Sequence, residues 1–303
     1  MRALLPEAGS VVFGEVDEPV PRPDEALVKV AAFSVNRGET FQLESDRPGW
    51  RPGKDVAGLV VQAAADGSGP AAGRPIVGHP PSAGWAEYVA VPTASLAEIP
   101  DPVPLRAAAA LPLAGLTALR LLRASGTTAG TRVLLTGASG GVGHYFVELA
   151  AAAGAEVTAI TSAPERGRRL SELGAAVVHG VRDAVGPFDV VLESTGGDDL
   201  PLALARVAPG GTLIWFGQAS RRPVTLDFFG FFDGPEGATI RHFHYAKAPY
   251  GEDLATLVRL TATGRLHPEL GRVADWSETA AVLTELRERR VRGNAVLTLE
   301  QNR

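Results

Sequence analysis

The sequence predicts an α/β protein in which a doubly wound parallel sheet is joined to a β-rich region. From about residue 105 onward, short apolar strands alternate with amphipathic helices, the pattern of a parallel sheet with crossover helices. Before that point, β-branched and alternating runs are separated by proline-rich segments such as Pro19–Pro23. We therefore expect a small, irregular β-rich domain next to a doubly wound one.

The individual elements follow from hydrophobic periodicity. The β-rich region carries strands at 11–16, 26–35, 56–65 and 85–91. A helical stretch at 105–122 is interrupted by Pro112. The later region alternates strands at 132–136, 156–161, 176–178, 189–193 and 212–216 with helices at 142–153, 165–173 and 200–207. Helices at 252–263 and 277–290 and a strand at 294–299 follow, and we expect that strand to complete the first domain. The predicted domains are therefore 1–108 with 246–303, and 109–245.

Composition narrows the function classes. The formal net charge of −5 favours neither a nucleic-acid partner nor an anionic membrane surface. The absence of cysteine excludes disulfides, thiolate nucleophiles and cysteine-ligated metal sites. Residues 1–5 are too short for a signal-peptide core, and the longest apolar run, 107–119, contains Pro112. We therefore expect a cytoplasmic protein.

The strongest chemical signal is the segment Val133–Gly143, in which a buried strand runs into glycines and then into a helix. Gly137 and Gly140 permit a tight turn, and Gly143 lets the helix pack closely on the strand. A pyrophosphate would lie at the helix N-terminus, beside free N–H groups and the positive end of the helix dipole. The alternative is a glycine-rich turn in an unrelated strand–helix unit. The pattern predicts a dinucleotide site formed by Ser139, Gly140, Gly141, Val142 and Gly143.

The residues after the second strand of this domain indicate which dinucleotide binds. Residues 159–163 contain no acidic side chain to bind the ribose hydroxyls of an unphosphorylated cofactor. Ser162 and Arg166 instead offer hydroxyl and guanidinium donors suited to a phosphomonoester. We predict NADPH, with Ser162 and Arg166 as phosphate contacts. The alternative is that the arginines here form a solvated helix face, which we expect for Arg169.

A set of motifs along nearly the whole chain resembles one family. They are Ser34–Asn36 with Glu39, Pro52–Gly58, Gly84–Val89, Ala109–Ala118, the glycine segment, Ser162–Arg166, Asp189–Gly197 and Arg292–Leu297. Together they resemble the zinc-independent, quinone-oxidoreductase-like branch of the medium-chain dehydrogenase/reductase superfamily. The resemblance implies that the first domain is a GroES-like substrate domain and the second a Rossmann NADPH-binding domain. It also implies a cleft between them, where the nicotinamide meets the substrate.

The same resemblance assigns further cofactor contacts. It implies that Thr117 lies near the nicotinamide amide, and that Thr195, Gly217 and Gln218 line the ribose side. Asn294 would lie near the phosphate end of the cofactor, where the family usually has lysine.

A metal site is not expected. Zinc-dependent relatives need a cysteine and a Gly-His-Glu segment, and Lys54 and Asp55 stand where the histidine and glutamate would be. The six histidines are scattered, and only His242 and His244 share a strand face, where a surface or interface position is the better interpretation. We predict that the protein holds no metal.

Asn36 is the predicted catalytic residue. Without a metal, a substrate carbonyl must be polarised by hydrogen-bond donors, and the family position of Asn36 is near the nicotinamide. The alternative is that Asn36 only caps a turn. Phe41 stands where relatives often carry tyrosine, so the proton donor stays open among solvent, Lys54, His79, His244 and Tyr250.

Two segments bear on the partners of the chain. The run Phe228–Phe232 is dense in aromatic surface and fits an apolar substrate pocket, a dimer interface or ordinary core. The resemblance implies a homodimer joined through an edge strand of the Rossmann sheet, here residues 239–245.

We expect an NADPH-dependent, zinc-independent reductase that transfers hydride to an activated C=C bond, in an enone or enal, or to a quinone. Its substrate would be a small molecule of apolar or aromatic character. Two alternatives stay open: a non-catalytic NADPH-binding protein, and a biosynthetic enzyme that uses the scaffold for a non-redox cyclisation or elimination.

Overall fold

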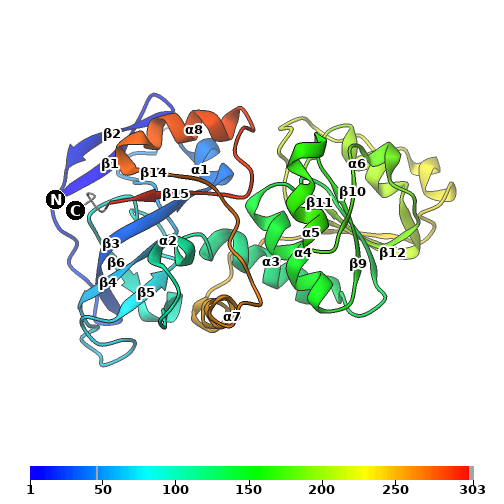
Figure 1. Ribbon diagram of the computed structural model, residues 1–303. Coiled ribbons are helices and arrows are strands. Elements are labelled where there is room, and N and C mark those ends of the chain that lie inside the picture. The colour runs from blue at the N-terminus through cyan, green and yellow to red at the C-terminus, as the bar shows by residue number, and fades with distance from the viewer. Residues whose placement is uncertain (46, 300–303) are drawn as a thin grey trace. The chain divides into compact units, whose positions relative to one another are not determined.

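The structure is a computed structural model that describes residues 1–45 and 47–299. The chain divides into two compact units (Figure 1). Unit 1 comprises Met1–Leu116 and Lys247–Arg303, and unit 2 comprises Thr117–Ala246. Helix α3 (Pro112–Ser125) runs through the first boundary. Within the described ranges, no helix is long and apolar enough to cross a membrane.

A six-stranded parallel sheet forms the centre of unit 2. Its strand order is β10 (Ala176–Val178), β9 (Glu156–Ile160), β8 (Arg132–Leu135), β11 (Phe188–Glu193), β12 (Val207–Trp215) and β13 (Thr239–His242). Every neighbouring pair is parallel. The chain enters at β8, builds outward to β10 and returns at β11, so the order reverses between β8 and β11. This arrangement confirms the predicted doubly wound sheet, whose ligands bind at such a reversal.

Helices and turns connect these strands. They are α4 (Gly141–Ala152), α5 (Arg168–Glu172) and α6 (Asp199–Leu204), with the 3-10 turns η2 (Pro164–Arg166), η3 (Val181–Asp183) and η4 (Phe228–Phe232). Helix α4 buries Phe146, Leu149 and Ala150 and contacts β9. Strand β8 is buried from Val133 to Leu135, as expected of a strand whose side chains are buried on both faces.

Unit 1 is built on a mainly antiparallel sheet. Its path is β14 (Leu270–Asp275), β15 (Asn294–Thr298), β3 (Glu25–Val35), β4 (Val56–Gln62), β5 (Pro75–Gly78) and β7 (Leu96–Glu98), and β6 (Tyr88–Pro92) also pairs with β3. Strands β1 (Arg2–Glu7) and β2 (Ser10–Glu15) form a separate hairpin. Strand β15 lies antiparallel to β3, with Ala295 opposite Val35, so distant parts of the chain share one sheet.

The helices of unit 1 are short, apart from α7. They are α1 (Arg37–Gln42), α2 (Leu105–Ala108), α7 (Gly251–Ala262) and α8 (Thr279–Arg287), with 3-10 turns η1 (Thr93–Ser95) and η5 (Trp276–Glu278). In the core, the rings of Phe33 and Trp85 stack with centroids 5.5 Å apart. The buried Trp85 Nε1 donates to the Ser34 carbonyl at 3.2 Å, which fixes the end of β3 from which α1 begins.

Several predicted boundaries were wrong, for identifiable reasons. The helix predicted at 200–207 ends at Leu204, because Val207 already pairs with Phe188 in the sheet. The helix predicted at 165–173 is divided at Gly167, where an added Cβ would lie 2.5 Å from Val177 Cγ1. The strands β1, β5, β7 and β14 and the helix α1 were not predicted, since most are short and lack clear alternation.

Candidate functional site

The glycine segment of unit 2 forms a tight turn between β8 and α4. Gly137 has φ +63°, which L side chains rarely adopt. A Cβ added at Gly143 would lie 2.0 Å from the carbonyl oxygen of Ala138, so only glycine fits there. Gly140 is the N-cap of α4 in an extended conformation, and its own added Cβ would meet nothing closer than 3.6 Å.

The N-terminus of α4 is built to receive an anion. Gly140, Gly141 and Val142 are partly exposed there, and the first turn carries no acidic residue. The first N–H groups of a helix have no partner within it and carry the positive end of its dipole. The predicted residues Gly140–Gly143 therefore surround a position suited to a phosphate.

The loop after β9 meets this turn through Arg166. The Arg166 Nε donates to Ser139 Oγ at 3.0 Å, and Ser139 is buried. Ser162 is exposed in the same loop, while Thr161 is buried and its hydroxyl donates to the Ala163 carbonyl at 3.1 Å. The structure therefore brings Ser139 and Arg166 together at the start of α4.

A buried carboxylate, Glu193, ties two loops of unit 2 together. Its Oε1 accepts from Thr136 Oγ1 at 3.0 Å and from Thr195 N at 2.7 Å, and its Oε2 accepts from Gly196 N at 3.0 Å. Ser194 N in turn donates to Thr136 Oγ1 at 2.8 Å. Burial raises the pKa of Glu193, against the opposing effect of these donors. The motifs of the sequence predict no role for Glu193, although an acid at the end of a buried apolar strand is a signal visible in the sequence.

The predicted ribose-side residues assemble on the same loops. Gly217 packs on Ser194, where an added Cβ would lie 3.1 Å from the Ser194 carbonyl oxygen. Gly196 has φ +68° and lies against Gln218. Thr195, Gly217 and Gln218 therefore lie beside one another, beyond the ends of β11 and β12.

Two other predicted contacts lie elsewhere in the fold. Thr117 is buried in α3 and belongs to unit 2. Asn294 belongs to unit 1, where its backbone N–H and its Nδ2 both donate to the Glu269 carbonyl, at 2.8 and 3.2 Å. Asn294 therefore starts β15 with its amide engaged inside unit 1.

In unit 1, Asp55 is the centre of a polar network. Its carboxylate is fully buried and accepts four hydrogen bonds. Oδ2 accepts from Ser34 Oγ at 2.6 Å and from Asn36 Nδ2 at 2.7 Å. Oδ1 accepts from His79 Nδ1 at 3.0 Å and from Leu113 N at 3.1 Å. The predicted catalytic residue Asn36 is thus hydrogen-bonded to a carboxylate, a contact that the sequence did not predict.

A second carboxyl group, Glu39, lies beside the same asparagine. Asn36 and Glu39 form a capping box at the start of α1, in which Asn36 N donates to Glu39 Oε2 at 2.9 Å. Burial, followed by the nearby charge of Asp55, raises the pKa of Glu39 to about 8. Within the described part of the chain, Glu39 Oε1 has no hydrogen-bond partner. Glu39 is therefore a neutral acid at neutral pH.

His79 extends the network toward α7. Its ring packs edge-on against Tyr250, with centroids 4.8 Å apart, while its Nδ1 faces Asp55. His79 and Tyr250 were both among the open candidates for proton donor, and the structure places them together. His244, another of those candidates, lies in unit 2 next to Tyr245.

The aromatic run of unit 2 is largely on the surface. Phe228, Phe229 and Phe232 are 68%, 72% and 64% exposed and contact one another, while Phe231 packs partly against the core. All four residues of the edge strand β13 are exposed. The core interpretation is therefore wrong for the three exposed rings.

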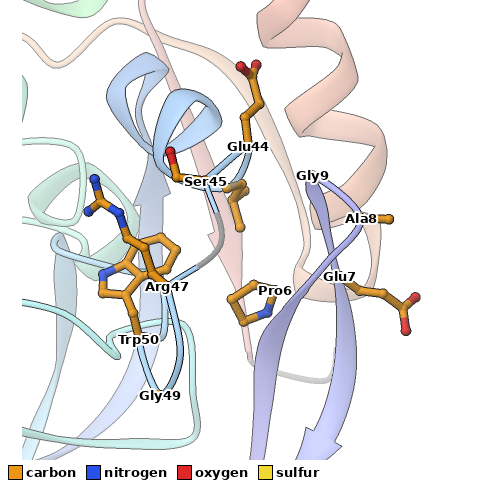
Figure 2. Close-up of a pocket in the computed structure, with 10 residues that line it drawn as sticks. Pro6, Glu7, Ala8, Gly9, Glu44, Ser45, Arg47, Gly49 and Trp50 are labelled. Atoms are coloured by element: carbon orange, nitrogen blue, oxygen red, sulfur yellow. The ribbon is translucent and has the colours of Figure 1, made fainter.

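A hollow of about 420 Å³ lies elsewhere in unit 1, between the β1–β2 hairpin and the loop after α1 (Figure 2). Among the residues that line the hollow, Arg47 has its guanidinium carbon 5.9 Å from the centroid of the Trp50 ring. None of the Asp55 network lines this hollow, so it is separate from that site. Across the described ranges, no group of three or more His, Cys, Asp or Glu side chains is placed to hold a metal ion.

Comparison with known proteins matches both halves of the chain. The alcohol dehydrogenase GroES-like domain matches residues 22–101, and the zinc-binding dehydrogenase domain matches residues 141–263. A chloroplast envelope quinone oxidoreductase homolog of Arabidopsis thaliana is 36% identical over 49% of this chain and 50% of its own length. A spectinabilin polyketide synthase protein, NorB of Streptomyces orinoci, is 31% identical over 98% of this chain.

The chain spans only 14% of the length of the Streptomyces protein, and the aligned region covers half of the Arabidopsis one. Among solved structures, the quinone oxidoreductase of Escherichia coli complexed with NADPH has a TM-score of 0.88 at 20% identity, over 98% of this chain and 99% of that one. The two matched domains, their order and these relatives show that the chain belongs to the quinone-oxidoreductase-like proteins of the medium-chain dehydrogenase/reductase superfamily.

Proposed function

We propose that the protein is an NADPH-dependent reductase that transfers hydride to an activated C=C bond, in an enone or enal, or to a quinone. The observation that carries this proposal is the glycine turn at the start of α4, with Arg166 hydrogen-bonded to Ser139 beside it. Relatives named as quinone oxidoreductases, and an NADPH complex of the same fold, support it.

The residues of unit 2 fit a phosphorylated dinucleotide. Side chains are excluded at Gly137 and Gly143, and the N–H groups that open α4 would hold the pyrophosphate. Ser162 and Arg166 would hold the additional phosphate of NADPH. When bound, the cofactor supplies the hydride. The nicotinamide side would be lined by Thr117, Thr195, Gly217 and Gln218.

Asn36 is the proposed donor to the carbonyl oxygen of the acceptor. As hydride adds to the β-carbon of an enone, negative charge develops on that oxygen, and an N–H placed beside it lowers the barrier. Loss of one such donor costs on the order of 10²–10³ in kcat.

The test is turnover with NADPH and a panel of enones, enals and quinones, followed by the loss of NADPH absorbance. We expect turnover with at least one acceptor, and a kcat about 10²-fold lower in Asn36→Ala with unchanged NADPH affinity. Protein that binds NADPH but consumes none across the panel would contradict the reductase. That outcome would favour a non-catalytic NADPH-binding protein. The motivation for this alternative is Phe41, which lacks the hydroxyl of the tyrosine that relatives often carry at this position.

We also propose that two copies associate through the edge of the unit 2 sheet. Strand β13 is exposed along its whole length, and Phe228, Phe229 and Phe232 add exposed apolar surface within the same unit. An unpaired strand edge and an apolar patch are both features that association would cover.

A further inference from the structure

We infer that Asp55 is a positioning residue, which fixes the Asn36 carboxamide so that one of its N–H bonds is free to donate to a substrate carbonyl oxygen. This inference rests on the proposed function and deepens it, because it names the group that orients the proposed donor. Three features of the network support it: the identity of the amide atoms, the direction of the free N–H, and the rigidity of the hydrogen bonds.

The first step identifies the amide atom that faces Asp55. Nitrogen and oxygen of an asparagine side chain are assigned from their hydrogen-bond partners. An ionised carboxylate only accepts hydrogen bonds, so the Asn36 atom 2.7 Å from Asp55 Oδ2 must be the NH₂ group. The Ser34 hydroxyl also donates to Oδ2, at 2.6 Å, which uses its proton and leaves its oxygen as an acceptor. Both neighbours of Nδ2 therefore require it to be the donor.

The second step gives the direction of the remaining N–H. Asn36 Nδ2 lies 2.7 Å from Asp55 Oδ2 and 3.2 Å from Ser34 Oγ, and these two oxygens are only 2.6 Å apart. The two acceptors therefore lie on the same side of Nδ2. The two N–H bonds of a planar amide diverge widely, so one bond is shared between both oxygens and the other points away.

The environment of that second N–H suits a ligand. Asn36 is partly exposed, whereas Ser34 and Asp55 are buried. Over residues 1–45 and 47–299, the second N–H finds no hydrogen-bond acceptor on the protein. A donor that is fixed, partly exposed and unused by the protein is suited to a carbonyl oxygen, the group that enones and quinones share.

The third step concerns rigidity. Asp55 cannot turn easily, because its second oxygen is held by His79 Nδ1 and Leu113 N. The backbone of Asn36 is held separately, through its N–H to Glu39 Oε2 at 2.9 Å. The four donors also balance much of the carboxylate charge, which would otherwise oppose negative charge on a substrate oxygen. Asn36 is therefore fixed at both backbone and side chain before a substrate arrives.

The kinetic test compares Asp55→Asn with Asp17→Asn, a matched change at an exposed residue after β2. An asparagine at 55 presents either an oxygen or an NH₂ group to Asn36, so the orientation is no longer imposed. We expect Asp55→Asn to lower kcat for an enone about tenfold or more, with NADPH affinity unchanged. Asp17→Asn makes the same chemical change outside the network, and we expect its kcat within about threefold of wild type. Equal kcat in Asp55→Asn and wild type would overturn the inference.

A spectroscopic test does not depend on a folded Asp55 variant. The chain has only three asparagines, at 36, 294 and 302, so selective ¹⁵N-asparagine labelling gives three side-chain amide pairs. In the free wild-type protein, we expect one Asn36 amide proton far downfield of its partner, because it is shared between two oxygens. On adding NADP⁺ and 2-cyclohexenone, the partner proton should move.

The two tests separate the failures. An Asn36 amide pair with the ordinary proton shifts of a solvent-exposed asparagine in the free protein would overturn the inference. So would a partner proton that stays in place while the same enone is reduced by the protein with NADPH. A downfield Asn36 proton in a protein that reduces no acceptor would instead leave the amide orientation standing and remove the proposed function.

Discussion

Asn36 is hydrogen-bonded to two carboxyl groups, Asp55 and Glu39, which differ in the number of hydrogen bonds that they accept. Asp55 is fully buried and accepts four hydrogen bonds. Glu39 has one oxygen without a partner in the described structure, and burial raises its pKa to about 8. Ionising two neighbouring buried carboxyl groups costs more free energy than ionising one, so Glu39 keeps its proton at neutral pH.

The proton on Glu39 makes stability depend on pH. Between the ordinary pKa of a glutamate and about 8, the folded protein holds a proton that the unfolded chain has lost. The unfolding free energy therefore falls as pH rises through this window, by about 1.4 kcal/mol per pH unit from this group. We expect Glu39→Gln to remove this fall, and urea unfolding at several pH values measures it.

The control for that measurement is Glu252→Gln, which changes an exposed glutamate of α7. Its unfolding free energy should follow the wild-type pH profile. A Glu39→Gln profile parallel to wild type between about pH 5 and pH 8 would show that Glu39 is already ionised in the folded protein.

At the level of one side chain, we propose that Arg166 decides the choice between NADPH and NADH. Its Nε donates to Ser139 Oγ at the start of α4, and a guanidinium is a suitable donor to a phosphate. A hydrogen bond to a charged group contributes about 1.5–3 kcal/mol, so Arg166→Ala should weaken NADPH binding about 10- to 100-fold and leave NADH binding nearly unchanged. Titration of both cofactors measures this. Arg169→Ala, which removes a side chain paired with Glu172 at 3.1 Å, is the control and should change neither affinity.

At the scale of elements, the sequence predicts the glycine turn of unit 2 but not the Asp55 network of unit 1. The turn from Gly137 to Gly143 lies within one strand–turn–helix unit, so residue spacing alone predicts its geometry. The Asp55 network joins Ser34, Asn36, His79 and Leu113, which lie 19 to 58 residues from Asp55 along the chain. No local pattern encodes such a meeting. The resemblance supplied Asn36, but the structure was needed for its partners.

Alanine substitutions at two glycines of the turn should affect the unfolding free energy and the NADPH affinity differently. Alanine at Gly143 would place a Cβ 2.0 Å from the Ala138 carbonyl oxygen, so Gly143→Ala should lower the unfolding free energy by about 1–3 kcal/mol and also weaken NADPH binding. Alanine at Gly140 meets nothing closer than 3.6 Å within the protein. Gly140→Ala should therefore lower the unfolding free energy by no more than about 1 kcal/mol, the cost of alanine at an N-cap. It should lose NADPH affinity, because its methyl group occupies the approach of the pyrophosphate.

Thermal unfolding and cofactor titration of both variants check this contrast. Normal NADPH affinity in Gly140→Ala would show that the cofactor does not approach this backbone.

At the scale of the whole molecule, the sequence predicts the fold class but not every boundary. Helix α3 continues from unit 1 into unit 2, so no linker composition marks the change. Strand β12 starts at Val207 rather than at residue 212, because Gly210 and Gly211 hide the strand pattern. Long apolar strands such as β3 were predicted almost to the residue, since their alternation is local.

The proposed association gives a prediction about size in solution. We expect a dimer in light scattering, and a monomer when Phe228→Asp and Phe229→Asp are combined, because two buried charges would oppose the contact. Val185→Asp is the control: Val185 is 91% exposed in unit 2, and its variant should stay dimeric. A monomeric wild type, or a dimer that survives the double change, would contradict this interface.

The most direct test of the account is calorimetric titration of the folded protein with NADPH and with NADH, each at two temperatures so that a vanishing enthalpy cannot conceal binding. We expect one saturable site per chain for NADPH and weaker binding of NADH. Stronger binding of NADH would contradict the roles given to Ser162 and Arg166. No binding of either nucleotide would contradict the assignment of the turn before α4 as a cofactor site.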